Sequence, residues 1–358
     1  MTAEPAARFS DRVQRVVDEV LEEQRDLLRS ISEDLSVLDE TLAEFLKGGK
    51  RLRPAFCYWG WLGAGGDDAD ALVEQGVVQV AASLEFLQAC ALIHDDVMDG
   101  SETRRGRPAV HHRFANLHRG HQWLGSPEDF GVATAILAGD LCLSWADQTM
   151  LRAALDPHSL HRAKRVYDEL RTELMGGQYL DLLEQARGGG SISRAAKVLR
   201  YKSAKYTIER PLHIGAAVAG ADQQLFDVYS EYGLPLGEAF QLRDDVLGVF
   251  GDPEETGKPA GDDLREGKRT ILVAMAFERA SEAQQTAMRE HLGDPALDQH
   301  GIATLREIIT ETGALAETES LIESLFARAL TALESPLLET RSASALRELA
   351  DAATHRKG

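Results

Sequence analysis

Apolar residues recur every three or four positions along most of this chain. Val77, Leu84, Leu87 and Ala91 illustrate that spacing, which is typical of the buried face of an α-helix. The segment 132–151 is apolar on nearly every side, as expected of a helix at the centre of a domain. No alternating strand pattern is evident, so we predict an all-α fold. Further helices are predicted over 162–185, 193–219, 223–249 and 270–280, and shorter amphipathic ones follow to about residue 354.

The breaks between these helices are short, and none has the length or composition of an interdomain linker. A chain of 358 residues is long for one domain, but a large helical domain reaches that size. We therefore expect a single all-α domain over 1–358, with residues 1–10 as a flexible N-terminal tail. The N-terminus lacks the basic and apolar regions of a signal peptide. We expect no stable membrane insertion, because no apolar stretch is judged long enough to span a bilayer.

The chain is acidic, with 39 Lys and Arg residues against 58 Asp and Glu residues and a net charge of −19. This charge argues against nucleic acid as a partner and against binding to an acidic membrane surface. Cys57, Cys90 and Cys142 lie in apolar segments without the spacing of metal ligands. We therefore expect reduced core thiols in a cytoplasmic protein. The adjacent His111 and His112 have no evident third ligand, so we expect no metal site there.

A cluster of aspartates ends the first apolar helix, at Asp95, Asp96 and Asp99, and Arg104 and Arg105 follow it. On a helix, Asp95 and Asp99 share a face about 6 Å apart along the axis, while Asp96 is rotated by roughly 100°. Stacked carboxylates repel each other unless a cation lies between them. Oxygen ligands suit Mg²⁺, which binds through one or two carboxylates together with substrate phosphates. Taken alone, the motif also fits a solvated acidic helix end.

A second apolar helix ends in the same way, at Asp244 and Asp245, and is followed by Lys258 and Lys268. Two such helix ends, each trailed by cations, suggest facing walls of one cavity. Carboxylates there would hold Mg²⁺ on a diphosphate while lysines and arginines bind its remaining oxygens. The apolar helices below would accept a hydrocarbon tail.

From about residue 45 to 280 the chain resembles a trans-isoprenyl diphosphate synthase of the polyprenyl synthetase family, with the family's motifs in the same order. The resemblance implies a helical barrel of the isoprenoid synthase type with a central apolar cavity, a homodimer, and about three Mg²⁺ ions per site. The matching stretches are GGKRLRP (48–54), Gln88, DDVMD (95–99), RRG (104–106), GD (139–140), GGQYLD (176–181), YKSAKYT (201–207), FQLRDD (240–245), GKP (257–259) and GKRT (267–270).

The resemblance also implies a role for each matched residue. The allylic diphosphate would be neutralised by Arg104, Lys202 and Lys258, with Lys268 beside them, and isopentenyl diphosphate would be fixed by Lys50, Arg53, Gln88 and Arg105. Ser203 and Gln241 would direct oxygen dipoles at the allylic cation, so the expected catalytic residues are Lys202, Ser203, Gln241 and Lys258. The expected metal ligands are Asp95, Asp99 and Asp244, with weaker contributions from Asp96 and Asp245.

The second motif departs from the family's DDxxD pattern at Gly248, and Asp252 lies a full turn too far to replace the third aspartate. We expect weaker Mg²⁺ handling without loss of catalysis. Gly248 supports one alternative, a non-catalytic partner subunit that binds prenyl diphosphates. The other alternative, a class I terpene cyclase, is opposed by Lys50, Arg53 and Arg105.

The length of the product is predicted from residues one turn before Asp95. In the family, bulky aromatic residues at this level stop growth at fifteen carbons, whereas this chain has the small residues Cys90 and Ala91. We therefore favour geranylgeranyl diphosphate as the product, with farnesyl diphosphate as the alternative. Trp145 and Leu84 are candidates for closing the tube further down.

Overall fold

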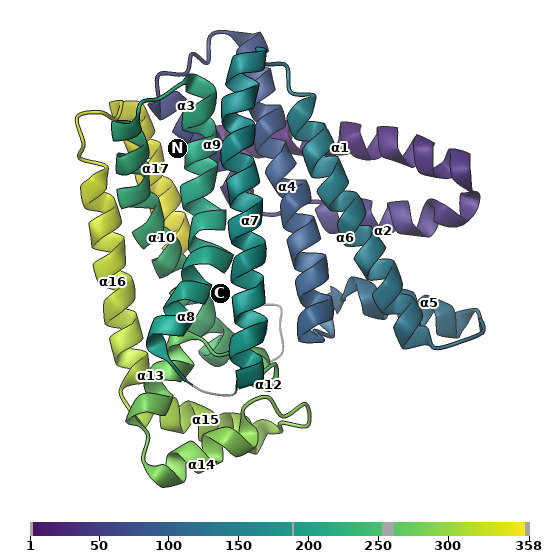
Figure 1. The fold of residues 1–358 in the computed structure, drawn as a ribbon, viewed down its shortest axis with the longest axis vertical. Coiled ribbons are helices and arrows are strands. Elements are labelled where there is room, and N and C mark those ends of the chain that lie inside the picture. Colours follow the sequence, from purple (N-terminus) through teal and green to yellow (C-terminus); the bar gives the residue numbers. More distant parts are fainter. Residues whose placement is uncertain (1–2, 188–189, 253–260, 355–358) are drawn as a thin grey trace. The chain divides into compact units, whose positions relative to one another are not determined.

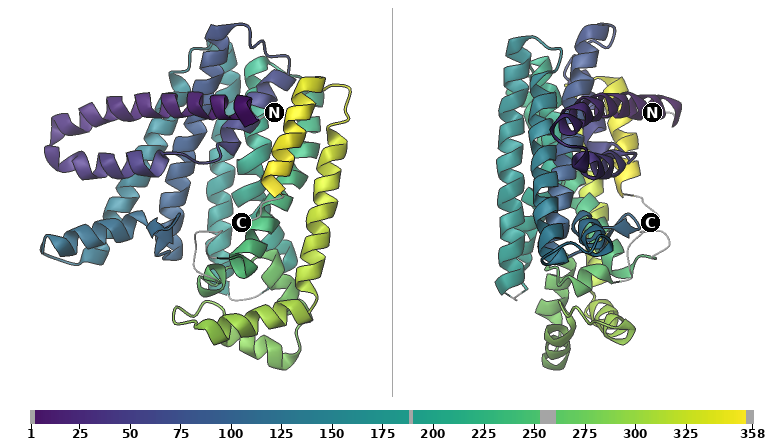
Figure 2. Two further views of the ribbon diagram at one scale, coloured as in Figure 1. Left: turned by 180° about the vertical axis from the view of Figure 1, so that it is seen from behind. Right: turned by 90° about the vertical axis from the view of Figure 1, so that its right-hand side faces the viewer.

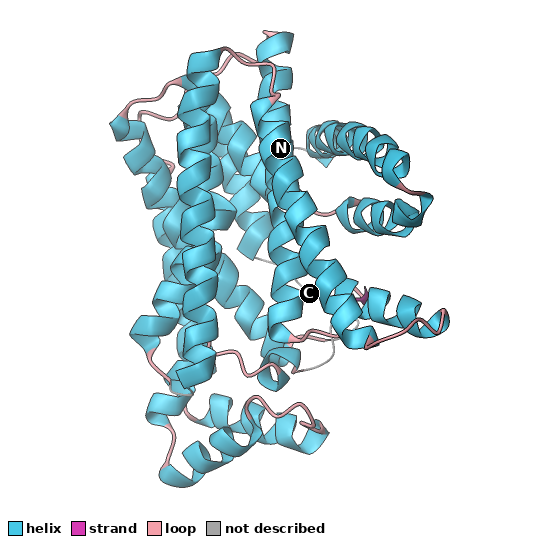
Figure 3. Ribbon diagram, turned by 45° about the vertical axis from the view of Figure 1, so that its right-hand side comes forward, coloured by secondary structure: helices cyan, strands magenta, loops and turns pink. Residues whose placement is uncertain are grey.

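The computed structural model describes residues 3–187, 190–252 and 261–354. Within these ranges the chain is almost wholly helical, and its strands are limited to two of two residues each (Figure 3). The predicted all-α fold is therefore confirmed. Contacts along the chain divide it into two compact units, Met1–Lys164 with Ile214–Gly220, and Arg165–His213 with Ala221–Gly358. The assignment of a single domain to 1–358 stays a prediction.

The first unit is built around two long helices, α4 and α6, which pack along each other, with α5 against α6 (Figure 1). Helices α1 and α2 form a hairpin, drawn in purple in Figure 2, and α1 also packs on α4. The elements are α1 (Ala3–Ile31), η1 (Glu33–Leu35), α2 (Ser36–Leu46), α3 (Leu52–Gly63), α4 (Ala71–Asp99), β1 (Thr103–Arg104), β2 (Arg107–Pro108), α5 (Val110–Gly120) and α6 (Pro127–Leu151).

Local sequence determines where α4 begins and ends. The Asp70 carboxylate accepts hydrogen bonds from the backbone N–H groups of Leu72 and Val73, which caps the N-terminus. At the other end Gly100 adopts a left-handed conformation (φ 66°), which ends the helix just after Asp99. The predicted apolar face is buried, with Leu84 and Leu87 at most 1% exposed.

The GD motif marks a close approach between α4 and α6. A Cβ atom at Gly139 would lie only 2.1 Å from Nε2 of His94, so only glycine leaves room for this imidazole. The same nitrogen lies 3.0 Å from the carbonyl oxygen of Ile136. His94 is therefore a packing residue that holds the end of α4 against α6.

The second unit is centred on α10, which packs against η2 and α16. Helices α8, η2 and α9 follow one another directly over the segment predicted as one helix, and α7 and α9 have residues in both units. The elements are α7 (Pro157–Arg187), α8 (Ile192–Val198), η2, a π-helical stretch (Leu199–Glu209), α9 (Arg210–Ala219), α10 (Gln223–Phe250), α12 (Asp262–Arg265), α13 (Ile271–Arg279), α14 (Glu282–His291), α15 (Gln299–Glu311), α16 (Ala314–Ala332) and α17 (Thr340–Thr354).

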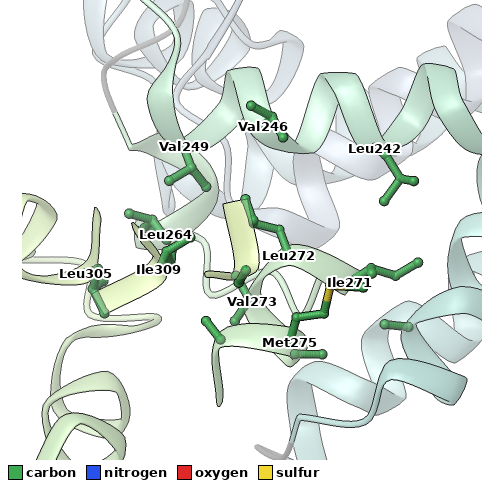
Figure 4. Close-up of a cluster of buried hydrophobic side chains, with 14 of the residues drawn as sticks. Leu242, Val246, Val249, Leu264, Ile271, Leu272, Val273, Met275, Leu305 and Ile309 are labelled. Carbon is green, nitrogen blue, oxygen red and sulfur yellow. The ribbon is translucent and has the colours of Figure 1, made fainter. Parts of the chain in front are cut away.

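An apolar cluster lies beneath the end of α10 (Figure 4). Leu242, Val246 and Val249 of α10 alternate with the polar residues of the second acidic motif and pack with Leu264 of α12 and Leu272 of α13. The motif's backbone is therefore fixed by core packing. Cys57, Cys90 and Cys142 are also buried, and none forms a disulfide.

Two sequence expectations need correction. Residues 3–10, expected to be a flexible tail, lie in α1, because Phe9 is buried and its ring centroid lies 4.8 Å from that of Tyr58. The statement that no apolar stretch is long enough to span a bilayer was too strict. By length and composition alone, α4 and α6 are each long and apolar enough to cross a membrane. However, 78% of the most apolar stretch of α4 is buried within the protein.

Candidate active site

The first acidic motif places its carboxylates in different surroundings at the end of α4. Asp96 is fully buried, whereas Asp95 and Asp99 are half-buried. The guanidinium group of Arg104 donates from Nε to both carboxylate oxygens of Asp96, at 3.0 and 3.2 Å, and from Nη2 to one of them. Asp96 thus holds Arg104, and Asp95 and Asp99 lie on a different face of the helix.

The RRG motif forms a tight hairpin, which the sequence analysis missed. Arg104 pairs with Arg107 across the strands β1 and β2, and the two residues between them, Arg105 and Gly106, have φ values of 54° and 72°. Positive φ at both central residues is typical of a type I′ turn, in which glycine is strongly favoured. The two-residue loop ending in glycine was the available signal. The turn directs Arg104 and Arg105 to different partners.

Arg105 and Gln88, which were both predicted to bind isopentenyl diphosphate, line the same small cavity in the first unit. Nη1 of Arg105 lies 3.5 Å from the carbonyl oxygen of Phe45. Burial lowers the pKa of Arg105 below its ordinary value; Arg104 and Arg51 lower it further, and Glu85 opposes them. The cavity therefore gathers positive charge and suits an anion. Its lining residues are Phe45, Leu46, Arg51, Glu85, Gln88, Ala89, Leu92 and Arg105.

Arg51 is a residue of this cavity that sequence reasoning missed. Its guanidinium group is buried, forms an ion pair with Glu85 of α4, and donates from Nη2 to the carbonyl oxygen of Leu46 at 2.7 Å. Its backbone is left-handed, with φ of 49°, which is uncommon for a non-glycine residue. Arg51 lies between Lys50 and Arg53 in the sequence, so its pair with Glu85 ties the start of α3 to the helix that carries Gln88.

Lys50 and Arg53 lie at the N-terminal end of α3. Lys50 is exposed just before the helix, and Arg53 is half-buried in its first turn. The helix dipole disfavours cations at this end and favours anions. The dipole of α3 therefore does not stabilise these two cations, whereas an anion bound at this end would.

Lys202 and Ser203 lie on the π-helical stretch η2 of the second unit, a type of helix often found at functional sites. Nζ of Lys202 lies 2.7 Å from Oδ2 of Asp181, the aspartate of the GGQYLD motif. A Cβ atom at Gly177 in the same motif would lie 2.4 Å from the backbone nitrogen of Lys202. The motif therefore lets α7 approach η2 closely and holds the lysine in place.

The second acidic motif lies near the end of α10. Nε2 of Gln241 donates to Oδ1 of Asp245 at 2.9 Å, and Asp244 is half-buried. Burial raises the pKa of Asp245 to about 8; Asp263 and Asp244 add to the rise, while Gln241 and Lys268 oppose it. The amide of Gln241 thus contacts the buried aspartate, and Asp244 is the motif's more accessible carboxylate.

Of the two lysines predicted after the second acidic motif, Lys268 forms ion pairs with neighbouring carboxylates. Nζ of Lys268 lies 3.1 Å from Oδ1 of Asp263 and 2.6 Å from Oε2 of Glu266. Lys258 lies outside the described residues, so its role stays a prediction.

The donors at these helix ends fit Mg²⁺ bound together with a phosphorylated substrate. Among the residues that the structure describes, no group of three or more His, Cys, Asp or Glu side chains forms a ready metal site. Mg²⁺ keeps several waters and needs only one or two protein carboxylates beside substrate phosphates. Asp95 with Asp99, and Asp244, are carboxylates of that kind.

Comparisons with known proteins identify similar chains. The sequence profile of the Polyprenyl synthetase family matches residues 36–309. A crystal structure of geranylgeranyl pyrophosphate synthase from Corynebacterium glutamicum, complexed with isoprenyl diphosphate and magnesium, is 41% identical, with a TM-score of 0.93 over 98% of this chain and 99% of that one.

Relatives named for other products are also similar. A geranylfarnesyl diphosphate synthase from Aeropyrum pernix is 33% identical over 308 residues, which cover 85% of this chain and 89% of the relative. A (2E,6E)-farnesyl diphosphate synthase from Mycobacterium bovis is 32% identical over 264 residues, which cover 73% of this chain and 67% of the relative.

Proposed function

This chain belongs to the polyprenyl synthetase family and is a trans-prenyltransferase, and we propose that it joins isopentenyl diphosphate to an allylic diphosphate to make geranylgeranyl diphosphate. The observation that carries the proposal is the end of α4, where Asp95 and Asp99 share a face and Arg105 and Gln88 line one cationic cavity. The site would use Mg²⁺, which when bound would neutralise charge on the diphosphate oxygens.

Two separate sets of side chains would bind the two substrate diphosphates. Arg105 and Gln88 line the cavity, so they would bind the diphosphate of isopentenyl diphosphate, and Lys50 and Arg53 at the start of α3 would bind its remaining oxygens. The buried pair of Arg51 and Glu85 would keep this loop in place. The double bond of the held substrate is then oriented for attack.

The allylic substrate would be ionised by cations that are held in position beforehand. Arg104 is held by Asp96, and Lys202 by Asp181. With Lys258 and Lys268, these groups would stabilise negative charge as it develops on the leaving diphosphate. The Ser203 hydroxyl and the Gln241 amide would face the allylic carbocation. Attack by the double bond forms the new C–C bond, and a proton then leaves to the departing diphosphate.

The product length is argued from the apolar residues before Asp95. Cys90 and Ala91 are small, and Sγ of Cys90 lies 3.7 Å from Nδ1 of His94. Below this level Phe86 and Trp145 form an edge-to-face pair, with ring centroids 6.3 Å apart, and both are buried. Small residues at positions 90 and 91 leave room for a product longer than fifteen carbons. Trp145 would form the floor that stops further growth. The neighbour from Corynebacterium glutamicum, named for geranylgeranyl pyrophosphate, supports the same length.

The proposed enzyme is a cytoplasmic homodimer that binds about three Mg²⁺ ions in each active site. The binding-partner and terpene-cyclase alternatives are not favoured, since the cavity retains Arg105 and Gln88 of the isopentenyl diphosphate site.

Product analysis tests the proposal. The purified protein would be incubated with Mg²⁺, isopentenyl diphosphate and, in turn, five-, ten- and fifteen-carbon allylic diphosphates, and the chain lengths separated by chromatography. We expect a twenty-carbon product. A fifteen-carbon product would correct the chain length, and no product with any primer would favour the binding-partner alternative.

A further inference from the structure

The side-chain amide of Gln14, on α1, contacts the loop that precedes α3. Its oxygen Oε1 accepts a hydrogen bond from the backbone N–H of Gly48 at 3.1 Å and another from Nη2 of Arg51. Its nitrogen Nε2 donates to Oδ1 of Asp18, one helical turn further along α1, at 2.8 Å. One amide oxygen therefore joins the first and last residues of the loop 48–51, and all of these residues belong to the first unit.

The loop 48–51 has a backbone conformation that needs such support. Its two glycines have φ of 73° and 101°, and Arg51 has φ of 49°. A left-handed backbone costs a non-glycine residue free energy and persists where surrounding contacts hold it. For Arg51 these contacts include the ion pair with Glu85 and the hydrogen bond to Gln14. Of these two partners, Gln14 is the one that also holds the other end of the loop.

The same loop lies against the cationic cavity. A Cβ atom at Gly49 would lie 3.8 Å from Nη2 of Arg105, so the backbone here passes beside that guanidinium group. Arg51 and Arg105 both line the cavity. Lys50, which was predicted to bind isopentenyl diphosphate, is the residue between Gly49 and Arg51. A displacement of the loop would therefore move Lys50 relative to Arg105.

Helix α1 is docked by contacts other than this amide. Val13, the preceding residue, is fully buried. Nη1 of Arg12 donates to Oε1 of Glu74 on α4 at 2.6 Å, and the hydroxyl group of Tyr58 on α3 donates to the same oxygen at 2.7 Å. These contacts hold α1 on α3 and α4, so the amide reaches the loop from a fixed support.

We propose that Gln14 is a positioning residue for isopentenyl diphosphate, and that by holding both ends of the loop before α3 it keeps Lys50 and Arg105 in the arrangement that binds the diphosphate. This inference rests on the proposed function, since it concerns a substrate of that reaction. The family profile matches from residue 36, so the inference adds a residue of α1, ahead of that match. An amide oxygen accepts both hydrogen bonds without adding negative charge beside a site for an anion. The competing explanation is that Gln14 only docks α1 and so contributes stability alone.

Kinetics measured together with stability separate these explanations. Gln14→Leu, which is close in size but accepts no hydrogen bond, should raise the KM for isopentenyl diphosphate by about tenfold, the effect of losing one hydrogen bond to a charged group. The KM for the allylic diphosphate should change little. Arg12→Gln, on the same helix, is the matched control, because it weakens the contact of α1 with α4 but does not touch the loop. It should lower the melting temperature without raising either KM.

Two further measurements do not depend on turnover. Isopentenyl diphosphate would be titrated by calorimetry into the protein with Mg²⁺ and an allylic thiolodiphosphate, whose C–S bond resists ionisation, and Gln14→Leu should weaken its binding as it raises the KM. Hydrogen–deuterium exchange followed by mass spectrometry should show faster exchange over residues 46–52 in Gln14→Leu, because the N–H of Gly48 loses its acceptor. Gln14→Glu keeps an oxygen acceptor and should retain the slower exchange.

The outcomes distinguish a failure of this inference from a failure of the proposed function. If Gln14→Leu lowers the melting temperature but leaves the KM and the affinity for isopentenyl diphosphate unchanged, in a protein that makes prenyl product, the inference is overturned and the proposed function stands. If the unaltered protein binds no isopentenyl diphosphate and makes no product with any primer, both are overturned.

Discussion

Arg51 and Glu85 form an ion pair in which both side chains are buried, with 3% and 7% of their surfaces exposed. They connect the loop before α3 to the middle of α4, and both line the cationic cavity. Neither residue stood out in the sequence, because a lone arginine among basic residues and a lone glutamate in an apolar helix are both usual at a protein surface. Burial makes the pair important, since a charge left alone there has no solvent to stabilise it.

We predict that Glu85→Ala destabilises the fold by about 3–5 kcal/mol, the usual effect of leaving one partner of a buried pair uncompensated. Arg51→Met combined with Glu85→Leu should recover much of that stability while still raising the KM for isopentenyl diphosphate. Chemical denaturation and steady-state kinetics measure the two effects. The control is Glu128→Gln, which removes an exposed pair with Arg119 and should change stability little, because solvent screens the pair. Equal effects of Glu85→Ala and Glu128→Gln would contradict the prediction.

The aspartates of the first motif should respond differently to substitution. Asp95→Ala and Asp99→Ala should lower turnover by orders of magnitude, because they share the face proposed for Mg²⁺. Asp96→Ala should act mainly by lowering the melting temperature and displacing Arg104, since the Asp96 carboxylate is buried on that guanidinium. Turnover, melting temperature and Mg²⁺ dependence distinguish these outcomes. Equal and mild losses at all three positions would argue against the metal site.

Substitutions in the two substrate sites should separate kinetically. Arg53→Ala should raise the KM for isopentenyl diphosphate far more than that for the allylic diphosphate, because Arg53 lies at the start of α3 with Lys50. Lys202→Ala should act on the allylic KM and on kcat, and so should Asp181→Asn through loss of its contact with Lys202. Initial rates with each substrate varied in turn provide the test. A reversed pattern would mean that the two sites have been exchanged.

A bulky residue at position 91 should shorten the product. Ala91 lies one helical turn before Asp95, so the ring of Ala91→Phe would project into the space proposed for the growing chain. We expect the main product to lose one or more five-carbon units, with the Mg²⁺ dependence unchanged. Ala91→Ser, which adds little volume, is the control. If chromatography shows the same products for Ala91→Phe as for the unaltered protein, another helix sets the limit.

His213 should make the protein less stable in acid. Burial, with a smaller contribution from Arg210, lowers the pKa of His213 to about 4, against about 6.5 in an unfolded chain. The folded state therefore favours the neutral ring, so this stabilisation is present above pH 6.5 and is lost as the pH falls towards 4. Its upper limit is about 3 kcal/mol. The free energy of unfolding of His213→Gln should fall less steeply between pH 6.5 and 5 than that of the unaltered protein, with the exposed His161→Gln as control. Parallel curves for His213→Gln and the unaltered protein would contradict the assignment.

The helices and the order of the motifs were readable from sequence because both are local properties. An apolar residue every three or four positions specifies a buried helix face, and the predicted segment 223–249 corresponds closely to α10 (Gln223–Phe250). Asp95 and Asp99 fall on one face by helix geometry alone. The tail expected at residues 1–10 was wrong from residue 3 onward, because Phe9 packs on Tyr58, a contact that no local pattern reveals.

Only the tertiary structure decided which charges meet. The pairs of Arg104 with Asp96, Lys202 with Asp181, and Arg51 with Glu85 join residues from different elements. Gly248 reads in sequence as a missing ligand, whereas in the fold the carboxylate of Asp263 fills the space beside it. The physical reason is that a local pattern specifies the direction of a side chain from its own helix. The neighbour it meets depends on how helices distant in sequence pack, and that packing is determined by burial over the whole core.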